Sequence, residues 1–432
     1  MKVFLTNVSC TIRYVLGMSD ALAHLLRRTT MAAHPARLER FADSSLDAAI
    51  DRIIDEAGVG DDGEAEMPWG ENGGPPADQE DSWGEVSMWW VDRLSSADAS
   101  LNDRMAWIWH NWFTTADEAY DGEKLTTDQL TLLYRHGLGD LRTLIHGVIT
   151  SGAMLRYLDA AGSRAYNPNE NLARELMELY TIGPQNYTED DVRAGARALA
   201  GWEVDDEVAR VWFDDSAAFV APLIFLGAQD EWDTAKVVEV LVDHPSTAHR
   251  IAARIWRDLV GSELTPDQAT QMGDRWREDG LQILPFVESV LRSDEFSDSM
   301  HQRYCTGLEW LIGARAIVDP DGNEESFDPW QLENLGQRPF APPSPAGWPD
   351  GQYWTRPGSL LPRLQMVQNL DTPMVTDRIW TTSDILRTAG LPEADPVGPL
   401  IDAVLRNSGI DLPDRQRLAW RVALTCPTFQ RH

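Results

Sequence analysis

The chain has 432 residues, 43% of them hydrophobic, so it is long enough to bury a large core. Its formal net charge of −32 makes duplex nucleic acid and anionic membrane surfaces poor partners, because carboxylates repel both. Lysine occurs only as Lys2, Lys124 and Lys236; codon preference for arginine or adaptation to high salt, which screens self-repulsion, would each explain this pattern.

Apolar residues recur mainly with the 3.6-residue period of a helix, and alternating strand-like runs are scarce. The sequence therefore predicts an all-α protein: a large multi-helix globular domain with few or no strands. The predicted helices are 20–29, 45–57, 85–117, 126–136, 138–160, 169–182, 189–201, 234–243, 245–260, 266–278, 281–293, 300–317, 358–370, 382–389, 397–407 and 413–424.

Four segments make up this domain. N-terminal helices occupy 1–56, and a central helical core occupies 85–318. Between them, 57–84 is rich in acid, glycine and proline, so we expect an exposed insertion whose stretch 60–82 can be deleted without unfolding the rest. Residues 319–432 supply C-terminal helices and a Pro/Trp-rich loop, too apolar for a free linker, which should be ordered over the core.

The stretch "NPNENLARELMELYTIGPQNYTEDDVRAGARALAGW" (167–202) combines charged side chains with two helix-start signals. Asn167 is a suitable N-cap, Pro168 suits the first helical position, and Glu170 can complete a capping box. On these grounds Asn167→Ala should lower stability by about 1 kcal/mol. A helical projection places Glu170, Asn171, Arg174, Glu175 and Glu178 on the face opposite the apolar one.

Two interpretations of that polar face remain open. A charged face on an amphipathic helix is usually solvated, and a Glu170–Arg174–Glu178 ladder would add only a few tenths of a kcal/mol per pair. The other interpretation is a catalytic cleft. His110 would join the signature carboxylates in this cleft. It lies opposite the core stripe of the 101–115 helix, and Trp107 shares its face, so that face is either covered or lines a cleft. A hydrogen-bonded core histidine is the favoured reading.

Several motifs resemble, in order, the bacterial and archaeal family catalogued as "domain of unknown function 1800". They are "HLLRRTT" (24–30), "WHNWF" (109–113), "RHGLGDLRTLI" (135–145), "AMLRYLD" (153–159), the 167–202 signature and "PPSPAGWPDGQYW" (342–354). The resemblance implies a helical protein without an established activity. It also implies relatives that are often exported and often encoded beside a protein resembling sulfatases and alkaline phosphatases.

This chain departs from the family pattern at possible ligand positions. Relatives usually carry His-Asn-His-Phe where this chain has His110, Asn111, Trp112 and Phe113, and a histidine where it has Tyr180. A histidine–aspartate pair and a lysine before "LG" (226–227) are also absent. If the family has a site on those histidines, this member has lost part of it.

Two functions from different classes fit these observations. The first is a non-catalytic scaffold or partner protein. The second is a hydrolase-like enzyme with a carboxylate/histidine cleft between the signature helix and the "WHNWF" helix. The sequence shows no other catalytic motif: it has no phosphate loop, nucleophile elbow or His-Glu-x-x-His. The candidate residues are His110, Asn111, Asn169, Glu170, Asn171, Arg174, Glu175 and Glu178.

We expect no cofactor and no stoichiometric transition metal, because the histidines do not pair at ligand spacing and Cys10, Cys305 and Cys426 are dispersed. No apolar run is long enough to cross a membrane. The N-terminal residues lack a clean apolar core followed by a cleavage site, so we expect a cytoplasmic protein, unlike many relatives.

Overall fold

The computed structural model describes residues 20–60, 63–67, 75, 84–119, 124–319, 329–369 and 379–431. These residues are mostly helical, as the sequence predicts. The first half contains α2 (Asp20–Thr29), α3 (Pro35–Arg40), α4 (Leu46–Glu56), α5 (Glu85–Ser95), α6 (Leu101–Trp112), η1 (Asp117–Ala119), α7 (Lys124–His136), α8 (Leu141–Ile149), α9 (Gly152–Tyr157), α10 (Asn171–Glu175), the π-helix η2 (Leu176–Tyr180) and α11 (Glu189–Ala198).

The second half begins with four short strands and returns to helices. It contains β1 (Trp202–Asp205), β2 (Arg210–Phe213), β3 (Leu223–Phe225), β4 (Ala228–Asp230), α12 (Thr234–Asp243), α13 (Pro245–Leu259), α14 (Pro266–Glu278), α15 (Ile283–Leu291), α16 (Asp294–Asp298), α17 (Gly307–Val318), α18 (Pro329–Asn334), η3 (Gly351–Thr355), α19 (Pro357–Asn369), α20 (Thr382–Thr388), α21 (Gly398–Leu405) and α22 (Leu412–Thr425).

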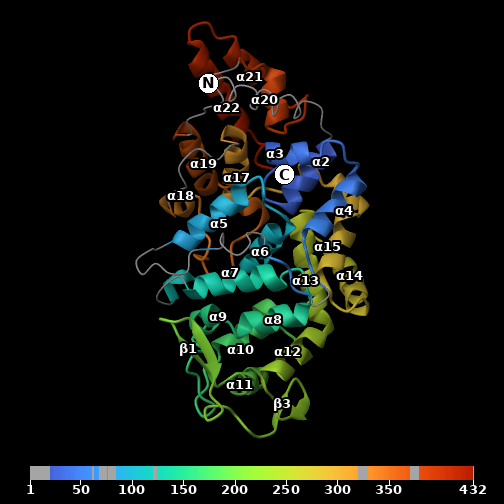
Figure 1. Ribbon diagram of the computed structural model, residues 1–432, viewed down its shortest axis with the longest axis vertical. Coiled ribbons are helices and arrows are strands. Elements are labelled where there is room, and N and C mark those ends of the chain that lie inside the picture. Colours follow the sequence, from blue (N-terminus) through green and yellow to red (C-terminus); the bar gives the residue numbers. More distant parts are fainter. Residues whose placement is uncertain are drawn as a thin grey trace.

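The molecule is elongated, with α6 near its middle (Figure 1). The strands and α9 to α11 lie at one end, and α20 to α22 lie at the other. All of α6 from Leu101 to Asn111 is buried, so this helix is the centre of the core rather than an amphipathic surface helix.

Local capping explains where two of the predicted helices are wrong. The predicted helix 85–117 is two helices, because Ser100 and Asp103 form a capping box that starts α6. The predicted helix 138–160 is also two, because Ser151 accepts a hydrogen bond from the Met154 amide and so caps α9.

The only sheets among the described residues are two antiparallel hairpins, β1–β2 and β3–β4. Both lie between α11 and α12, in the region where no helix was predicted. The expectation of few strands is therefore confirmed.

The stretch 57–84 is only partly described, and its described part is docked. Ala65 is buried, and its amide donates a hydrogen bond to the Arg135 carbonyl at the end of α7. A Cβ on Gly139 would lie 2.0 Å from the Gly63 carbonyl oxygen, so the backbone segments around these two glycines are in close contact. Within 63–67 only Ala65 is buried, and Glu64 and Glu66 are exposed. The exposed insertion stays a prediction, because most of 68–83 lies outside the described residues.

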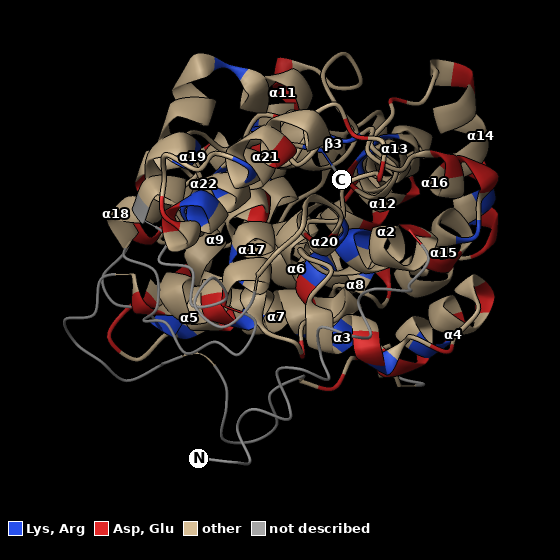
Figure 2. Cartoon of the chain, turned by 90° about the horizontal axis from the view of Figure 1, so that it is seen from above, with Lys and Arg blue, Asp and Glu red and all other residues tan. Residues whose placement is uncertain are grey.

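The Pro/Trp-rich loop packs on the core as predicted, with Phe340, Trp348 and Trp354 all buried. Acidic residues are spread over outer helices such as α4 and α14 (Figure 2), so no single element carries the excess charge. No helix within the described ranges is long and apolar enough to cross a membrane.

Candidate functional site

The signature helix begins later than the sequence suggests. It starts at Asn171, not after an Asn167 cap, because the Asn167 amide donates to the Arg164 carbonyl in a preceding turn. The side chain that satisfies the first turn belongs to Asn169, whose Oδ1 accepts from the Asn171 amide at 2.8 Å. The predicted Asn167–Pro168–Glu170 cap is therefore wrong, and its role falls to Asn169.

This correction changes the expected mutant. Asn169→Ala should lower the unfolding free energy by about 1 kcal/mol, the usual cost of a lost capping hydrogen bond. Asn167→Ala should leave it within about 0.5 kcal/mol, since the Asn167 side chain is exposed. Urea denaturation of both variants measures the difference, and equal losses would contradict the assignment.

A π-helical segment follows directly after Glu175. The Thr181 hydroxyl donates to the Leu176 carbonyl at 2.5 Å, and the Gly183 amide donates to the Met177 carbonyl at 2.7 Å. Such wide turns are rare and are frequent at functional sites. Periodicity read at 100° per residue cannot predict them.

Arg250 of α13 closes the carboxyl end of this segment. Its guanidinium donates to the carbonyls of Glu178, Leu179 and Thr181 at 2.8, 3.1 and 2.9 Å. Gly183, with a φ of +85°, lies so close that a Cβ would be 2.7 Å from Arg250 Nη1. Glycine is thus required here for two reasons: it adopts the left-handed backbone without strain, and it leaves room for the Arg250 guanidinium.

The charged side chains of the signature are largely committed to one another. Arg174 binds Glu170 at 3.1 Å and Glu189 of α11 at 2.8 Å. Glu178 accepts from the Tyr187 hydroxyl at 2.7 Å, so the expected Glu170–Arg174–Glu178 ladder forms only in its first half. Asn171 Nδ2 donates to Asp159 at 3.2 Å.

Glu175 differs from these neighbours. Its half-buried carboxylate makes no hydrogen bond or ion pair within the described part of the chain. Burial raises the pKa of Glu175, the Glu178 charge adds to this, and Arg174 opposes it. Glu175 is therefore the signature carboxylate best suited to exchange a proton.

Two phenols accompany Glu175, and we call Glu175, Tyr157, Tyr180 and Thr114 the Glu175 cluster. Burial raises the pKa of both tyrosines, and the Glu175 charge contributes to each, while the Thr114 hydroxyl opposes it. Tyr180 is fully buried, and its hydroxyl makes no hydrogen bond of normal geometry among the described residues. A buried hydroxyl left in this way calls for a functional or structural explanation.

Trp112 and Tyr180, at which the family resemblance implies histidines, lie in contact. Trp112 Nε1 donates to the Tyr180 carbonyl at 3.1 Å, and the Phe113 and Tyr180 rings lie 5.5 Å apart. The guanidiniums of Arg250 and Arg254 each lie 5.8 Å from the Trp112 ring. Trp112 therefore contacts the Tyr180 backbone, while the Tyr180 ring packs against Phe113.

His110 belongs to a different environment. It is fully buried, its Nε2 accepts from the Phe340 amide at 3.0 Å, and aromatic rings surround it. Burial lowers the pKa of His110 to about 3, so the imidazole is neutral at pH 7. Of the two alternatives that the sequence left open for this face, covered or lining a cleft, the structure has the covered one. The rings within 6 Å are those of Trp90, Trp107, Phe340 and Trp348.

Asn111 is also used to hold the Pro/Trp-rich loop. Its Oδ1 accepts from the Trp348 amide at 2.9 Å. Gly347 lies against the same residue, since a Cβ there would be 2.4 Å from Asn111 Oδ1. The motif residues His110 and Asn111 therefore anchor the loop instead of facing the Glu175 carboxylate.

The neutral His110 predicts a pH dependence. Its pKa is near 6.5 in the unfolded chain and about 3 in the fold, so protons bind the unfolded state first and stability falls as pH drops below 6.5. Between pH 7.5 and 5.5 the wild type should lose about 1 kcal/mol more than His110→Gln, whose amide can still accept from Phe340. His24, whose pKa burial also lowers to about 3, leaves a remaining slope in both proteins. Guanidinium titrations at the two pH values measure the difference, and parallel losses would contradict it.

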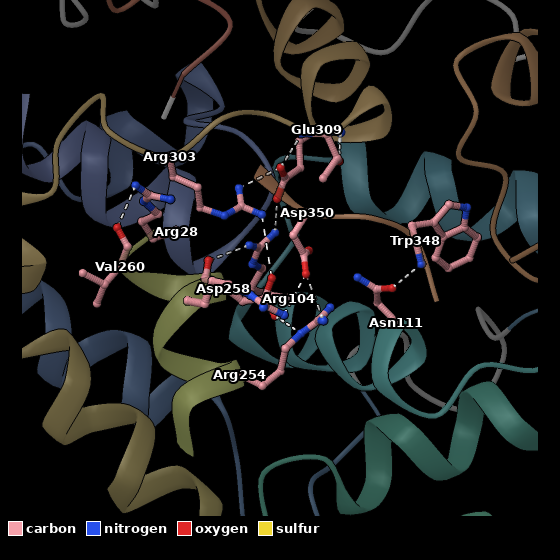
Figure 3. A network of polar contacts seen from close by, with 12 residues as sticks. Arg28, Arg104, Asn111, Arg254, Asp258, Val260, Arg303, Glu309, Trp348 and Asp350 are labelled. Carbon is pink, nitrogen blue, oxygen red and sulfur yellow. Dashed lines mark hydrogen bonds and ion pairs between the residues drawn. The ribbon is translucent and has the colours of Figure 1, made fainter. Parts of the chain in front are cut away.

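A network of buried ion pairs lies beneath the loop (Figure 3). Glu309 of α17 binds Arg104 of α6 at 2.6 Å and Arg303 at 2.7 Å. Asp258 binds Arg254 at 2.7 Å within α13, and Arg254 reaches Asp350 of the loop at 3.3 Å. Buried charges of this kind require their partners, so the network fixes the loop to the core.

An open hollow of about 350 Å³ adjoins the end of the signature. Its walls come from the 185–191 segment, the β3–β4 turn and the start of α13. Gln185 and Leu226 line it with left-handed backbones at φ +79° and +48°. The lining residues are Gln185, Asn186, Tyr187, Thr188, Asp191, Leu226, Gly227 and His244.

Glu175 is among the candidates predicted from the sequence, and Tyr180 is one of the departures from the family pattern, but Tyr157 and Thr114 are not among the predicted site residues. Tyr157, Tyr180 and Thr114 come from three separate segments, and only the "AMLRYLD" and "LYTIG" motifs hinted at the tyrosines. Arg250 carries no local signal. In the described part of the chain, no three His, Cys, Asp or Glu side chains are grouped so that they could hold a metal ion.

The comparisons with known proteins agree with the motif order. No curated protein and no solved structure matches the chain. The sequence profile of the family described as "Protein of unknown function (DUF1800)" matches residues 24–431, which is nearly the whole chain. The chain thus belongs to the DUF1800 family.

Proposed function

We propose that the protein is a non-catalytic helical scaffold or partner protein. The observation that supports this best is the structural engagement of the candidate side chains: all except Glu175 are hydrogen-bonded or ion-paired to other described residues of the fold. His110 is the most telling, since a general base must reach a substrate proton directly or through one water, and His110 is fully buried against Phe340. The engaged residues are His110, Asn111, Asn169, Glu170, Asn171, Arg174 and Glu178.

The partner we propose is the sulfatase- or alkaline-phosphatase-like protein that the family resemblance implies. Co-expression of the two chains from the same genome should give a complex that elutes as one species in size-exclusion chromatography. The complex should persist with Glu175→Gln, because a scaffold needs no free carboxylate. Separate elution of the two chains at micromolar concentration would contradict the proposed partner.

The alternative is a hydrolase-like enzyme, and one observation favours it. Glu175 is half-buried, has no hydrogen-bond or ion-pair partner among the described residues, has a raised pKa and lies in one cluster with Tyr157 and Tyr180. General acid–base catalysis by one carboxyl contributes about 10²–10⁴-fold to a rate.

A panel of chromogenic carboxyl, phosphate and sulfate esters and glycosides separates the two functions. The non-catalytic protein releases no product above the buffer rate. Turnover that falls at least about 100-fold in Glu175→Gln, with an unchanged unfolding free energy, would establish the enzyme and overturn our proposal. Glu170→Gln, on the same helix but paired with Arg174, is the matched control.

A further inference from the structure

Strand β2 has an outer edge that no described residue pairs. In β1, the Trp202 carbonyl accepts from the Gly162 amide at 2.9 Å, and the Val204 carbonyl accepts from Arg156 Nη2 at 2.8 Å. These carbonyls therefore point away from β2. In an antiparallel ladder, Trp202–Phe213 and Val204–Val211 must then be the pairs without mutual hydrogen bonds.

The backbone groups of Val211 and Phe213 consequently point outward from β2. Within the described residues, neither makes a hydrogen bond on that side. A hydrogen bond just beyond the strands agrees with this register. The Asp214 amide donates to the Gly201 carbonyl at 2.7 Å, so the pair next to Trp202–Phe213 is a hydrogen-bonded one. An open edge of this kind is a template for another strand, and proteins usually blunt it.

Several large apolar or aromatic side chains are exposed on β2 and in the segments around it in the sequence. Among them, Tyr166 is 89% exposed and Val220 is 81% exposed, although both are apolar or aromatic. Tyr166 is tied to the strands, because the neighbouring Ala165 amide donates to the Ala217 carbonyl at 3.0 Å. Figure 1 places the strands at one end of the molecule. The exposed large side chains in 166–224 are Tyr166, Val208, Trp212, Phe213, Val220 and Ile224.

The charge around the edge indicates what it would accept. Between Trp202 and Ser216 the chain has six carboxylates and one arginine. Arg156 and Arg164 neutralise those of Glu203, Asp206 and Asp214.

Glu207 and Asp215, which stand on either side of β2, are exposed and have no ion pair among the residues described. Lys124 Nζ lies 3.2 Å from the Glu207 carbonyl oxygen and offsets part of this charge, but the six carboxylates still outnumber the basic groups Lys124, Arg156, Arg164 and Arg210. The remaining negative charge would attract a basic segment.

We propose that the outer edge of β2 docks an extended segment of a partner protein, with apolar residues alternating with lysine or arginine. The segment adds a third strand, so its main chain pairs with Val211 and Phe213 while basic side chains approach Glu207 and Asp215. A second copy of this chain is a poorer occupant, because each copy carries a net charge of −32. This inference rests on the proposed function, since it names the surface by which the protein binds its partner.

The probe is a dye-labelled peptide of alternating valine and lysine, titrated with the full chain and followed by fluorescence anisotropy. Saturable binding is expected. A twin peptide with N-methylated amides on its pairing edge keeps the side chains but loses the strand hydrogen bonds, so it should bind at least about tenfold more weakly. A valine–glutamate peptide should not bind. Equal binding of the N-methylated twin would overturn strand addition.

Protein variants test the charges. The double variant Glu207→Lys and Asp215→Lys should weaken binding of the lysine peptide at least about tenfold, because two attractive contacts become repulsive. The matched control is Glu278→Lys and Asp279→Lys, a charge change of the same size on exposed residues of α14 and its C-cap. Equal weakening by both pairs would show a non-specific charge effect and overturn the assigned edge.

The experiments distinguish failure of the docking edge from failure of the proposed non-catalytic function. Failure of the wild type to bind the lysine peptide overturns the docking edge alone, whereas Glu175-dependent turnover overturns the proposed function. Sedimentation of the protein by itself should show a monomer. A dimer that Val211→Pro abolishes would make the occupant a second copy, against our proposal.

Discussion

Glu309→Gln should lower the unfolding free energy by about 3–5 kcal/mol, the usual cost of removing one partner from a buried ion pair. Glu309 is 1% exposed, and its carboxylate binds both Arg104 and Arg303 while accepting from the Thr306 amide at 2.9 Å. The amide keeps the size of the side chain but leaves two guanidiniums in the core without their negative charge. Urea denaturation followed by tryptophan fluorescence gives the difference directly.

The control is an ion pair of the same type in solvent. Asp402 binds Arg406 one helical turn away, and the arginine is 78% exposed. Asp402→Asn should therefore change the unfolding free energy by less than about 1 kcal/mol. A loss below 1 kcal/mol for Glu309→Gln as well would mean that the interior arginines find other acceptors, and the fixed network would not exist.

Gly183→Ala should also lower the unfolding free energy strongly, by about 2–4 kcal/mol. A left-handed backbone costs a residue with a Cβ about 1–2 kcal/mol. The remainder comes from Arg250, because the new Cβ would displace a guanidinium that donates to three carbonyls at the end of the π-helix.

Two controls isolate the arginine contribution. Gly227→Ala has a similar φ of +80° and nothing within 4 Å of the new Cβ, so it should show the backbone cost alone. In an Arg250→Ala background, Gly183→Ala should fall to the same value, since the atom that it displaces is gone. Additive losses for the two substitutions would contradict the contact.

Local sequence signals predicted helices well where a cap marks the boundary. The bounds of α12 and α14 agree with the predicted 234–243 and 266–278, since Asp233 and Thr265 cap them and Pro266 begins the second. The same rule placed a cap at Asn167 that the structure assigns to Asn169, because the preceding turn uses the Asn167 amide. A cap signal identifies a helix start only when nothing nearby competes for the same group.

The site was less predictable than the helices. Trp107 beside His110 indicated a face that is either covered or lines a cleft, but nothing in the sequence decided between the two or told which segment covers it. The π-helix changes which residues share a face after Glu175, and that insertion has no signature in periodicity. The contacts of Trp112 with Tyr180 and of Arg250 with Glu178 join residues about 70 positions apart, where no local pattern can specify a partner.

The buried ion pairs also bear on how the chain can fold during synthesis. Their members Arg104, Asp258, Glu309 and Asp350 are spread over more than half of the sequence, from α6 to the loop before η3. In an emerging chain, Arg104 thus lacks its Glu309 partner until 205 further residues have been added, and Arg254 lacks Asp350 for 96 residues. Closing such long loops is slow, and incomplete cores expose surfaces that aggregate. A nascent chain stalled before Asp350 should therefore stay open to proteolysis, and protection should arise late and in one step.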